Sequence, residues 1–143
     1  MQLPDANVLL YAVNDAAPDH AAAVRWLDGA LNGQRAVGFA WVVLLAFLRL
    51  STHRAVFERP LTVAQAVSVV RDWLAAPPAV LVSPTARHVD VLAGLLTETG
   101  TAANLVNDAH LAALAVEHDA VLVSYDADFG RFRGLRWERP AAT

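Results

Sequence analysis

The sequence predicts an α/β layer fold in which helices cover a central, mostly parallel sheet. Short apolar runs of strand length alternate along the chain with longer segments of helical periodicity, a pattern typical of α/β proteins. The stretches between strands are long enough for crossover helices, which favours parallel pairing with right-handed connections. A length of 143 residues suits one domain, and we expect a single domain over residues 1–143.

The chain opens with an expected strand over residues 1–5, which leads directly into a helix over residues 6–13. Residues 14–19 form a loop, and Asp19 is placed to cap the next helix, over residues 20–31. An Asn-Gly pair then ends that helix.

The central part of the chain continues with a buried strand over residues 36–39. The helix that follows, over residues 41–51, is apolar nearly all round, so we expect it to be buried or to lie at an interface. Residues 52–60 are irregular. A helix then runs over residues 61–75 until a pair of prolines stops it.

The last part of the chain begins with a strand over residues 80–82. Thr85 is placed to cap a helix over residues 86–99, and Gly100 ends it. The remaining elements are expected at residues 105–118 (helix), 120–124 (strand) and 135–137 (a last short strand). In parallel sheets, sites form beyond the carboxyl ends of the strands.

The composition excludes several classes of protein. Hydrophobic residues make up 56% and charged residues 17%, so the chain is not a disordered tail. It has no cysteine, which excludes disulfides, zinc–thiolate sites and thiol nucleophiles. The net charge of −3 gives no global attraction to nucleic acid, so RNA contacts would come from local arginines. The start of the chain has no signal-peptide pattern and the longest apolar stretch is too short for a bilayer; we expect a cytoplasmic protein without membrane contact.

Four aspartates lie where burial would disfavour a charge. Asp5 and Asp126 follow expected strands, Asp128 comes two residues later, and Asp108 begins an otherwise apolar helix. A carboxylate next to a core needs a partner, and the chain contains no lysine. A shared divalent cation is therefore the expected partner, with Mg²⁺ first and Mn²⁺ possible, because both prefer oxygen ligands. Such ions serve phosphodiester hydrolysis, so the pattern indicates a nuclease.

Two neighbouring polar residues are expected to support this site. Asn104 precedes Asp108 by one helical turn and would share its face of the helix, where it would hydrogen-bond a ligand or water. Ser124 would do the same for Asp126 or for a metal-bound water. The alternative stays open for each acid: Asp5 and Asp108 as helix caps, Asp126 and Asp128 as turn residues.

At these residues the sequence resembles the PIN-domain family, in particular the VapC-type toxins of bacterial toxin–antitoxin pairs. The resemblance covers nearly the whole chain and rests on three acidic blocks in order, at residues 5–7, 107–115 and 124–129. It implies a PIN-like three-layer α/β/α sandwich with a central, mostly parallel twisted sheet. It also implies a Mg²⁺-dependent endoribonuclease that hydrolyses RNA, is held inactive by a VapB-type antitoxin and forms a homodimer.

The resemblance also implies roles for individual residues. The metal positions correspond to Asp5, Asp108 and Asp126, with Asp128 as an auxiliary catalytic acid, and Asn7 and Arg49 as supporting residues. This sequence departs from the family pattern at one place, since Ala46 stands where the family usually has a glutamate. One tightly held ion, or a second one brought by the substrate, fits that departure better than a four-acid, two-metal site.

Other polar and aromatic residues are assigned weaker roles. Arginines near the site and at the C-terminal end would either form a basic rim for RNA phosphate or pair with surface acids. These are Arg49, Arg54, Arg131, Arg133, Arg136 and Arg139. Trp26, Trp41, Trp73 and Trp137 are interpreted as core or interface residues.

The histidines receive no catalytic role. His110 follows Asp108 by two residues, so their side chains point away from each other on a helix, and we interpret His110 as structural or surface-exposed rather than as a general base. The others have no carboxylate or second histidine at ligand spacing: His20, His53, His88 and His118.

Three functions remain in competition. The first is a metal-dependent endoribonuclease toxin. The second is a catalytically weak module that binds RNA or a protein partner, with Ala46 marking the loss of activity. The third is a PIN nuclease of RNA maturation.

Overall fold

The computed structural model describes residues 1–100 and 105–141. In these residues five parallel strands form one sheet in the order β3-β2-β1-β4-β5. The strands are β1 (Gln2–Pro4), β2 (Val37–Ala40), β3 (Ala79–Val82), β4 (Val121–Val123) and β5 (Trp137–Glu138). The central strand β1 pairs through Gln2 with Val37 on one side and Val121 on the other. The α/β class and the parallel pairing predicted from the sequence are confirmed.

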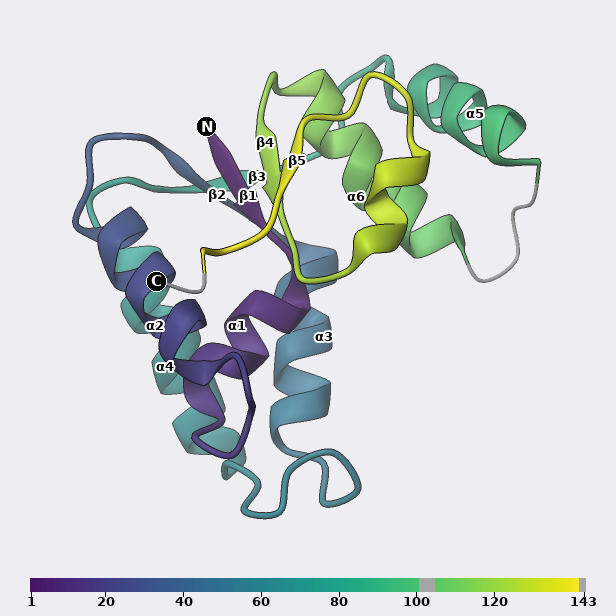
Figure 1. Cartoon of the computed structure of the whole chain (residues 1–143). Coiled ribbons are helices and arrows are strands. Elements are labelled where there is room, and N and C mark those ends of the chain that lie inside the picture. The colour runs from purple at the N-terminus through teal and green to yellow at the C-terminus, as the bar shows by residue number, and fades with distance from the viewer. Residues whose placement is uncertain (101–104, 142–143) are drawn as a thin grey trace.

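Six α-helices of the described residues flank the sheet. They are α1 (Ala6–Val13), α2 (His20–Leu31), α3 (Trp41–Ser51), α4 (Val63–Ala75), α5 (His88–Thr99) and α6 (Val106–Glu117). A 3₁₀ helix, η2 (Ala127–Arg131), follows β4. Figure 1 shows α1 to α4 together on one side of the sheet, while α5 and α6 lie together on the other. This is the expected layered arrangement.

Capping explains where several helices begin and end. Thr62 and Gln65 form a capping box at the start of α4, and Gly100 ends α5 in the left-handed conformation at φ 73°. Two predicted caps are wrong. Asp19 occupies the N-cap position of α2, but its side chain caps nothing and lies 3.4 Å from the guanidinium of Arg139. Helix α5 begins at His88 rather than at residue 86, because Thr85 donates to Glu117 through its amide and hydroxyl and is held in a turn before the helix, where its hydroxyl also accepts from the Arg87 amide.

The core lies between the sheet and the helices. Leu3, Phe39 and Leu122 are completely buried on adjacent strands. Trp73 of α4 packs against Phe39 with ring centroids 6.3 Å apart and against Phe47 with centroids 4.7 Å apart. The expected core role therefore holds for Trp73.

One glycine is required by close packing between strands. A Cβ atom at Gly38 would lie 2.6 Å from Cγ2 of Val82 and 2.9 Å from Sδ of Met1, so a larger residue on β2 would require these side chains to move.

Part of the apolar helix α3 faces solvent. Trp41 is 52% exposed and Leu45 is 58% exposed, although Val43, Leu44 and Phe47 on the same helix are buried. An exposed apolar face of this kind is typical of an interface. Within the described residues, no helix is long and apolar enough to span a bilayer.

Candidate active site

The carboxyl edge of the sheet brings Asp5 and Ser124 together. Pro4 and Val123 are partners in the parallel register of β1 and β4, so the residues that follow them meet at the same edge. The Asp5 amide donates to the Val123 carbonyl at 2.9 Å and continues the ladder by one residue. The Ser124 hydroxyl donates to Oδ2 of Asp5 at 2.7 Å.

A small hydrogen-bond network holds Asp5 in one orientation. Its Oδ1 accepts from the Ala6 amide at 2.6 Å, and its Oδ2 accepts from Nδ2 of Asn7 at 2.9 Å as well as from Ser124. Asn7 in turn accepts from the Tyr125 amide at 3.1 Å through its Oδ1. The side chains that follow β1 and β4 are thereby locked together. Asp5 caps α1, as the structural alternative proposed, but the network also directs its carboxylate toward the site.

Ser124 has a different role from the expected one. Its fully buried hydroxyl donates to Asp5 and accepts from the Asp126 amide at 3.0 Å and from Asn7 at 3.0 Å. It therefore supports the Asp5 carboxylate and the backbone of Asp126, and not the Asp126 carboxylate. All its hydrogen-bonding capacity is used in this way, because one hydroxyl has one donor and two acceptor positions.

Asp108 approaches the other acids from α6. It lies in the first turn of that helix, where Leu105 occupies the N-cap without a side-chain hydrogen bond. Burial and the negative charges of Asp5, Asp126 and Asp128 raise the pKa of Asp108 from its ordinary value to about 6. The four aspartates from three parts of the sequence thus share one electrostatic neighbourhood.

The pKa of Asp5 is also raised, chiefly by burial and to a smaller extent by Asp126. The hydrogen bonds from Ser124 and Ala6 act in the opposite direction. Asp5 therefore has internal donors that stabilise its charge, whereas the causes acting on Asp108 are all unfavourable to its charge. Asp108 is the acid that most needs an external positive partner.

A cavity of about 590 Å³ opens between α1, α3 and α6 and is lined by Asp5 and Asp108. Arg49 lies on the same wall and supplies a positive charge from the last turn of α3. Ala46, one turn earlier, also lines the cavity, so the position where the family usually has a glutamate does face the acids here. The rest of the lining is mainly apolar and includes Leu45.

Asp126 and Asp128 are not among the residues that line the cavity, but both are close enough to act on the charge of Asp108. Oδ1 of Asp126 accepts from the Asp128 amide at 2.8 Å and caps η2, in agreement with the turn alternative. Asp128 pairs with Arg131 at 2.9 Å across one turn of η2, and both side chains are more than half exposed. Asn104, the remaining predicted support, lies outside the described residues.

The donor set suits a hard divalent cation. A carboxylate offers about four acceptor positions, and Asp5 uses three of them, so one remains for a ligand. Burial and, after it, the negative charges of the other three aspartates raise the pKa of Asp108, and a cation would offset both effects. In residues 1–100 and 105–141, no three His, Asp or Glu side chains already stand close enough to hold a metal ion. The chemistry of the residues fits a metal, but their present side-chain positions do not form a closed coordination shell.

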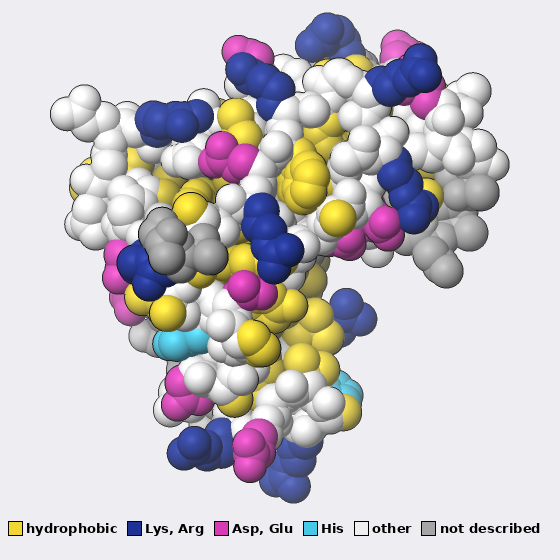
Figure 2. Space-filling view, viewed as in Figure 1, with side chains coloured by type: hydrophobic (Ala, Val, Ile, Leu, Met, Phe, Trp, Pro, Cys, Tyr) yellow, Lys and Arg dark blue, Asp and Glu magenta, His cyan; other side chains and the backbone are white. Residues whose placement is uncertain are grey.

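Three of the four arginines predicted to cluster at the C-terminal end form ion pairs with acids, and Arg133 is not among them in the part of the chain that the structure describes. Arg131 pairs with Asp128, Arg136 with Asp119 at 2.5 Å, and Arg139 with Asp19. Figure 2 shows arginines scattered over one face of the molecule, with acidic side chains beside most of them. These contacts favour surface pairing over a dedicated rim for RNA phosphate.

The sequence analysis missed one cluster. His88, to which no role was assigned, contacts Glu117 through Nδ1, and its Nε2 lies 2.8 Å from Nδ1 of His110. His88 is 29 positions from Glu117 and 22 positions from His110 in the sequence, so no local spacing indicated these contacts. The structural interpretation of His110 agrees with this contact.

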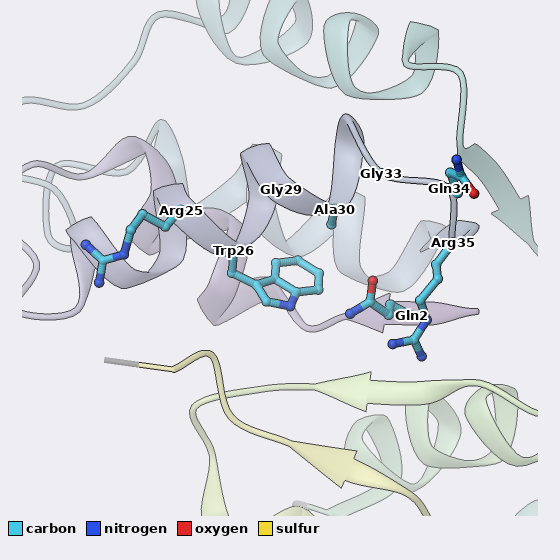
Figure 3. Close-up of a pocket in the computed structure, with 8 residues that line it drawn as sticks. All are labelled: Gln2, Arg25, Trp26, Gly29, Ala30, Gly33, Gln34 and Arg35. Atoms are coloured by element: carbon cyan, nitrogen blue, oxygen red, sulfur yellow. The ribbon is translucent and has the colours of Figure 1, made fainter. Parts of the chain in front are cut away.

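A second hollow, of about 370 Å³, lies at the other end of β1. Figure 3 shows Trp26 and Gln2 facing each other across it with Arg35 beside Gln2, while the side chains of Arg25 and Gln34 point away. Gln2 stands at the start of β1 and Asp5 directly after its end, so this hollow is separate from the acidic cavity.

The parallel sheet with acids at its carboxyl edge defines a nuclease-like class of α/β domain, and comparison with known families identifies it. The PIN domain profile matches residues 3–135, and the chain belongs to the PIN-domain family. Within the family it is 64% identical to Ribonuclease VapC37 of Mycobacterium tuberculosis over 142 residues, which are 99% of each chain. It is 41% identical to Ribonuclease VapC33 of the same species, over 98% of each chain.

Solved structures confirm the fold. VapBC2 of Rickettsia felis, bound to a DNA fragment from its promoter, aligns with a TM-score of 0.71 at 18% identity and covers 96% of this chain and 97% of its own. VapC20 of M. tuberculosis, described as a sarcin-ricin loop cleaving toxin, aligns with a TM-score of 0.68 at 17% identity over 95% of this chain and 99% of its own.

Proposed function

We propose that this chain is a metal-dependent endoribonuclease and the toxin of a VapBC-type toxin–antitoxin pair in the cytoplasm. The observation that carries the proposal is the convergence of Asp5 and Asp108 on one cavity, with Asp126 and Asp128 close enough to raise the pKa of Asp108. Relatives that share 64% and 41% of their residues with it over the full chain are named VapC ribonucleases.

Asp5, Asp108 and Asp126 would hold the ion, with Mg²⁺ as the expected metal and Mn²⁺ as a substitute. When bound, the ion would neutralise a phosphate and make a water more acidic. The chain's own residues have separate tasks. Ser124 and Asn7 orient Asp5. Arg49 faces the same cavity and would contact a phosphate oxygen of the RNA. Asp128 would act as the auxiliary acid.

The cavity also suits the proposed antitoxin. Its lining combines acids with apolar side chains such as Val42 and Leu45, so it would accept a partner segment with apolar residues and one basic residue. The solved relatives of R. felis and of Haemophilus influenzae are VapBC complexes. We also propose a homodimer. Its basis is the exposed apolar face of α3, which includes Trp41 and Leu45.

The direct test is cleavage of RNA by the purified chain with and without Mg²⁺ or Mn²⁺, with Asp5→Asn as the control. We expect metal-dependent cleavage that disappears in the variant and in the presence of the antitoxin encoded beside the toxin. Metal-dependent cleavage that survives in Asp5→Asn would contradict the proposed site.

One observation favours the second candidate, a catalytically weak module that binds RNA or protein. Ala46 lines the cavity where the resemblance leads one to expect a glutamate, so the site has one potential oxygen ligand fewer. RNA binding without cleavage at saturating Mn²⁺ would select this candidate. Cleavage without toxicity and without an adjacent antitoxin gene would instead select the third, a nuclease of RNA maturation.

A further inference from the structure

A chain of hydrogen bonds joins the two helices of the α5–α6 pair. The Glu117 carboxylate, whose side chain is completely buried, accepts from the Thr85 amide at 3.0 Å, from the Thr85 hydroxyl and from Nδ1 of His88. Nε2 of His88 meets Nδ1 of His110 at 2.8 Å, with the rings nearly perpendicular. The chain therefore runs from the end of α6, through the start of α5, and back to the beginning of α6.

Each link in this chain has one donor and one acceptor. Burial alone raises the pKa of Glu117, but the hydrogen bonds from His88 and Thr85 lower it below its usual value, so Glu117 is an ionised acceptor. Nδ1 of His88 must then carry a proton. With neutral imidazoles, Nε2 of His88 is the acceptor and Nδ1 of His110 is the donor. Loss of either histidine breaks the chain between α5 and the first turns of α6.

This chain of hydrogen bonds ends next to the candidate site. His110 follows Asp108 by two residues, and the completely buried Ala109 lies between them. Asp108 stands in the first turn of α6, whose amides lack partners within the helix and whose N-cap supplies no side-chain bond. His110 is the first residue beyond that turn. A fixed His110 therefore limits fraying of the segment that carries Asp108.

Apolar packing gives α5 limited support for this task. Leu95 is its only fully buried residue among those described, and the partly buried Val91, Leu92 and Leu96 pack against the core beside it. These apolar contacts begin one turn into α5, so at its first residue the polar contacts of His88 are what join the helix to α6. Three like charges act on Asp108 at the same time and would push the first turn of α6 away from the sheet edge.

We propose that Glu117, His88 and His110 form a positioning chain that holds Asp108 at the acidic cavity. The proposal rests on the proposed function, because it assigns the chain a task in presenting a metal-binding carboxylate. None of its three residues is among those that line the acidic cavity. Their effect is transmitted through the backbone of α6.

The test compares two substitutions of one residue. His110→Asn places an amide nitrogen where Nδ1 stood and keeps the donor to His88, whereas His110→Leu fills a similar space without it. Mn²⁺ affinity is measured by calorimetry, and amide hydrogen exchange of residues 106–110 is measured without metal. We expect His110→Leu to weaken Mn²⁺ binding by about tenfold or more, the scale of losing an outer support of a metal ligand, and to speed exchange of the first turn. His110→Asn should stay within about threefold of the wild type.

Two further variants make the result specific. His118→Ala removes the contact of 2.8 Å between Nε2 of His118 and the Ser83 carbonyl, on the same helix but at its far end, and should leave Mn²⁺ affinity and exchange at residues 106–110 unchanged. The double variant His88→Ala/His110→Leu should bind Mn²⁺ no more weakly than His110→Leu, since both break one chain. If His110→Leu does not fold, Thr85→Val replaces it. That variant removes the hydroxyl bond to Glu117 together with the bond that the hydroxyl accepts from the Arg87 amide, and it should weaken Mn²⁺ binding in the same direction.

The outcomes separate the two claims. Wild-type protein that binds Mn²⁺ while His110→Leu retains its affinity and its exchange protection would overturn the positioning role alone. An equal loss in His118→Ala would also overturn it, because the effect would then reflect general destabilisation. Wild-type protein that binds no Mn²⁺ would overturn the proposed function, and the positioning role would fall with it.

Discussion

Replacement of Asp108 by asparagine should stabilise the metal-free protein. The half-buried Asp108 carboxylate has no hydrogen-bond donor among the described residues and is repelled by Asp5, Asp126 and Asp128. Its pKa rises from 3.8 to about 6. At about 1.4 kcal/mol per pKa unit, a shift of roughly two units sets a ceiling of about 3 kcal/mol. Because the carboxylate is only partly buried, solvent screening lowers the expected gain to about 1 kcal/mol.

The pH dependence follows from the direction of the shift. The folded protein holds a proton on Asp108 over a range in which the unfolded chain has lost it, so the stability of the wild type falls as the pH rises from about 4 to above about 6. Asparagine does not titrate, so the variant lacks this contribution to the pH dependence of stability. Asp108→Asn and the wild type should therefore unfold at similar temperatures below pH 4. Above pH 7 the variant should melt about 3 °C higher, as expected for about 1 kcal/mol in a domain of this size.

Metal should reverse the order of stability. At a Mn²⁺ concentration about 100 times the dissociation constant, binding stabilises the wild type by about 2.7 kcal/mol, which exceeds the gain from the substitution. The assay is thermal unfolding at pH 4 and pH 7.5, with EDTA or with a Mn²⁺ titration. The reasoning would be refuted if the Asp108→Asn protein melted at a lower temperature than the wild type at pH 7.5 in EDTA. It would also be refuted if Mn²⁺ raised the melting temperature of the variant as much as that of the wild type.

Three further predictions concern the surroundings of the site. Ser124→Ala should lower the free energy of unfolding by about 2 kcal/mol in urea titrations, because it leaves buried partners of the hydroxyl unsatisfied; a loss below about 0.5 kcal/mol would contradict the network around Asp5. Ala46→Glu should destabilise the metal-free fold at pH 7.5 and tighten Mn²⁺ binding in calorimetry, and an unchanged or weaker affinity in the folded variant would count against its placement beside the acids. Leu45→Gln should fold like the wild type but dissociate at higher protein concentration in light scattering, since Leu45 is 58% exposed; an unaltered dimer would exclude this face as the interface.

The sequence determined most of the fold because its local signals agreed with one another. Helices α1, α2 and α3 begin and end at the predicted residues, and β2 differs from its prediction by one residue. The predicted start of α5 failed where a tertiary contact overrode a local preference. Thr85 has the chemistry of an N-cap, but its hydroxyl and amide bind the buried Glu117. A capping residue can be recognised from its neighbours in sequence, but a competing partner 32 residues away cannot.

The same distinction applies to the site. Parallel strands place their carboxyl ends at one edge, so the proximity of Asp5 and Ser124 follows from the order of elements alone. The contact between His88 and His110 depends on the angle at which α5 packs on α6, and the periodicity of the sequence does not predict that angle. Ser124 was predicted as a support, but Asp5 was not predicted as its partner, for a related reason. Its hydroxyl was within reach of two aspartates, and only the positions of β1 and β4 decide that it donates to Asp5.

The two aspartates that line the cavity differ in how the protein supports their charge. Asp5 receives hydrogen bonds from Ser124, Asn7 and the Ala6 amide, so part of its charge is stabilised by the fold itself. Asp108 has like charges around it and no such donors among the described residues. An external cation would therefore act chiefly on Asp108, and a basic side chain of a protein partner in the cavity would neutralise the same charge. Metal and partner should for this reason weaken each other's binding, by the same factor in both directions.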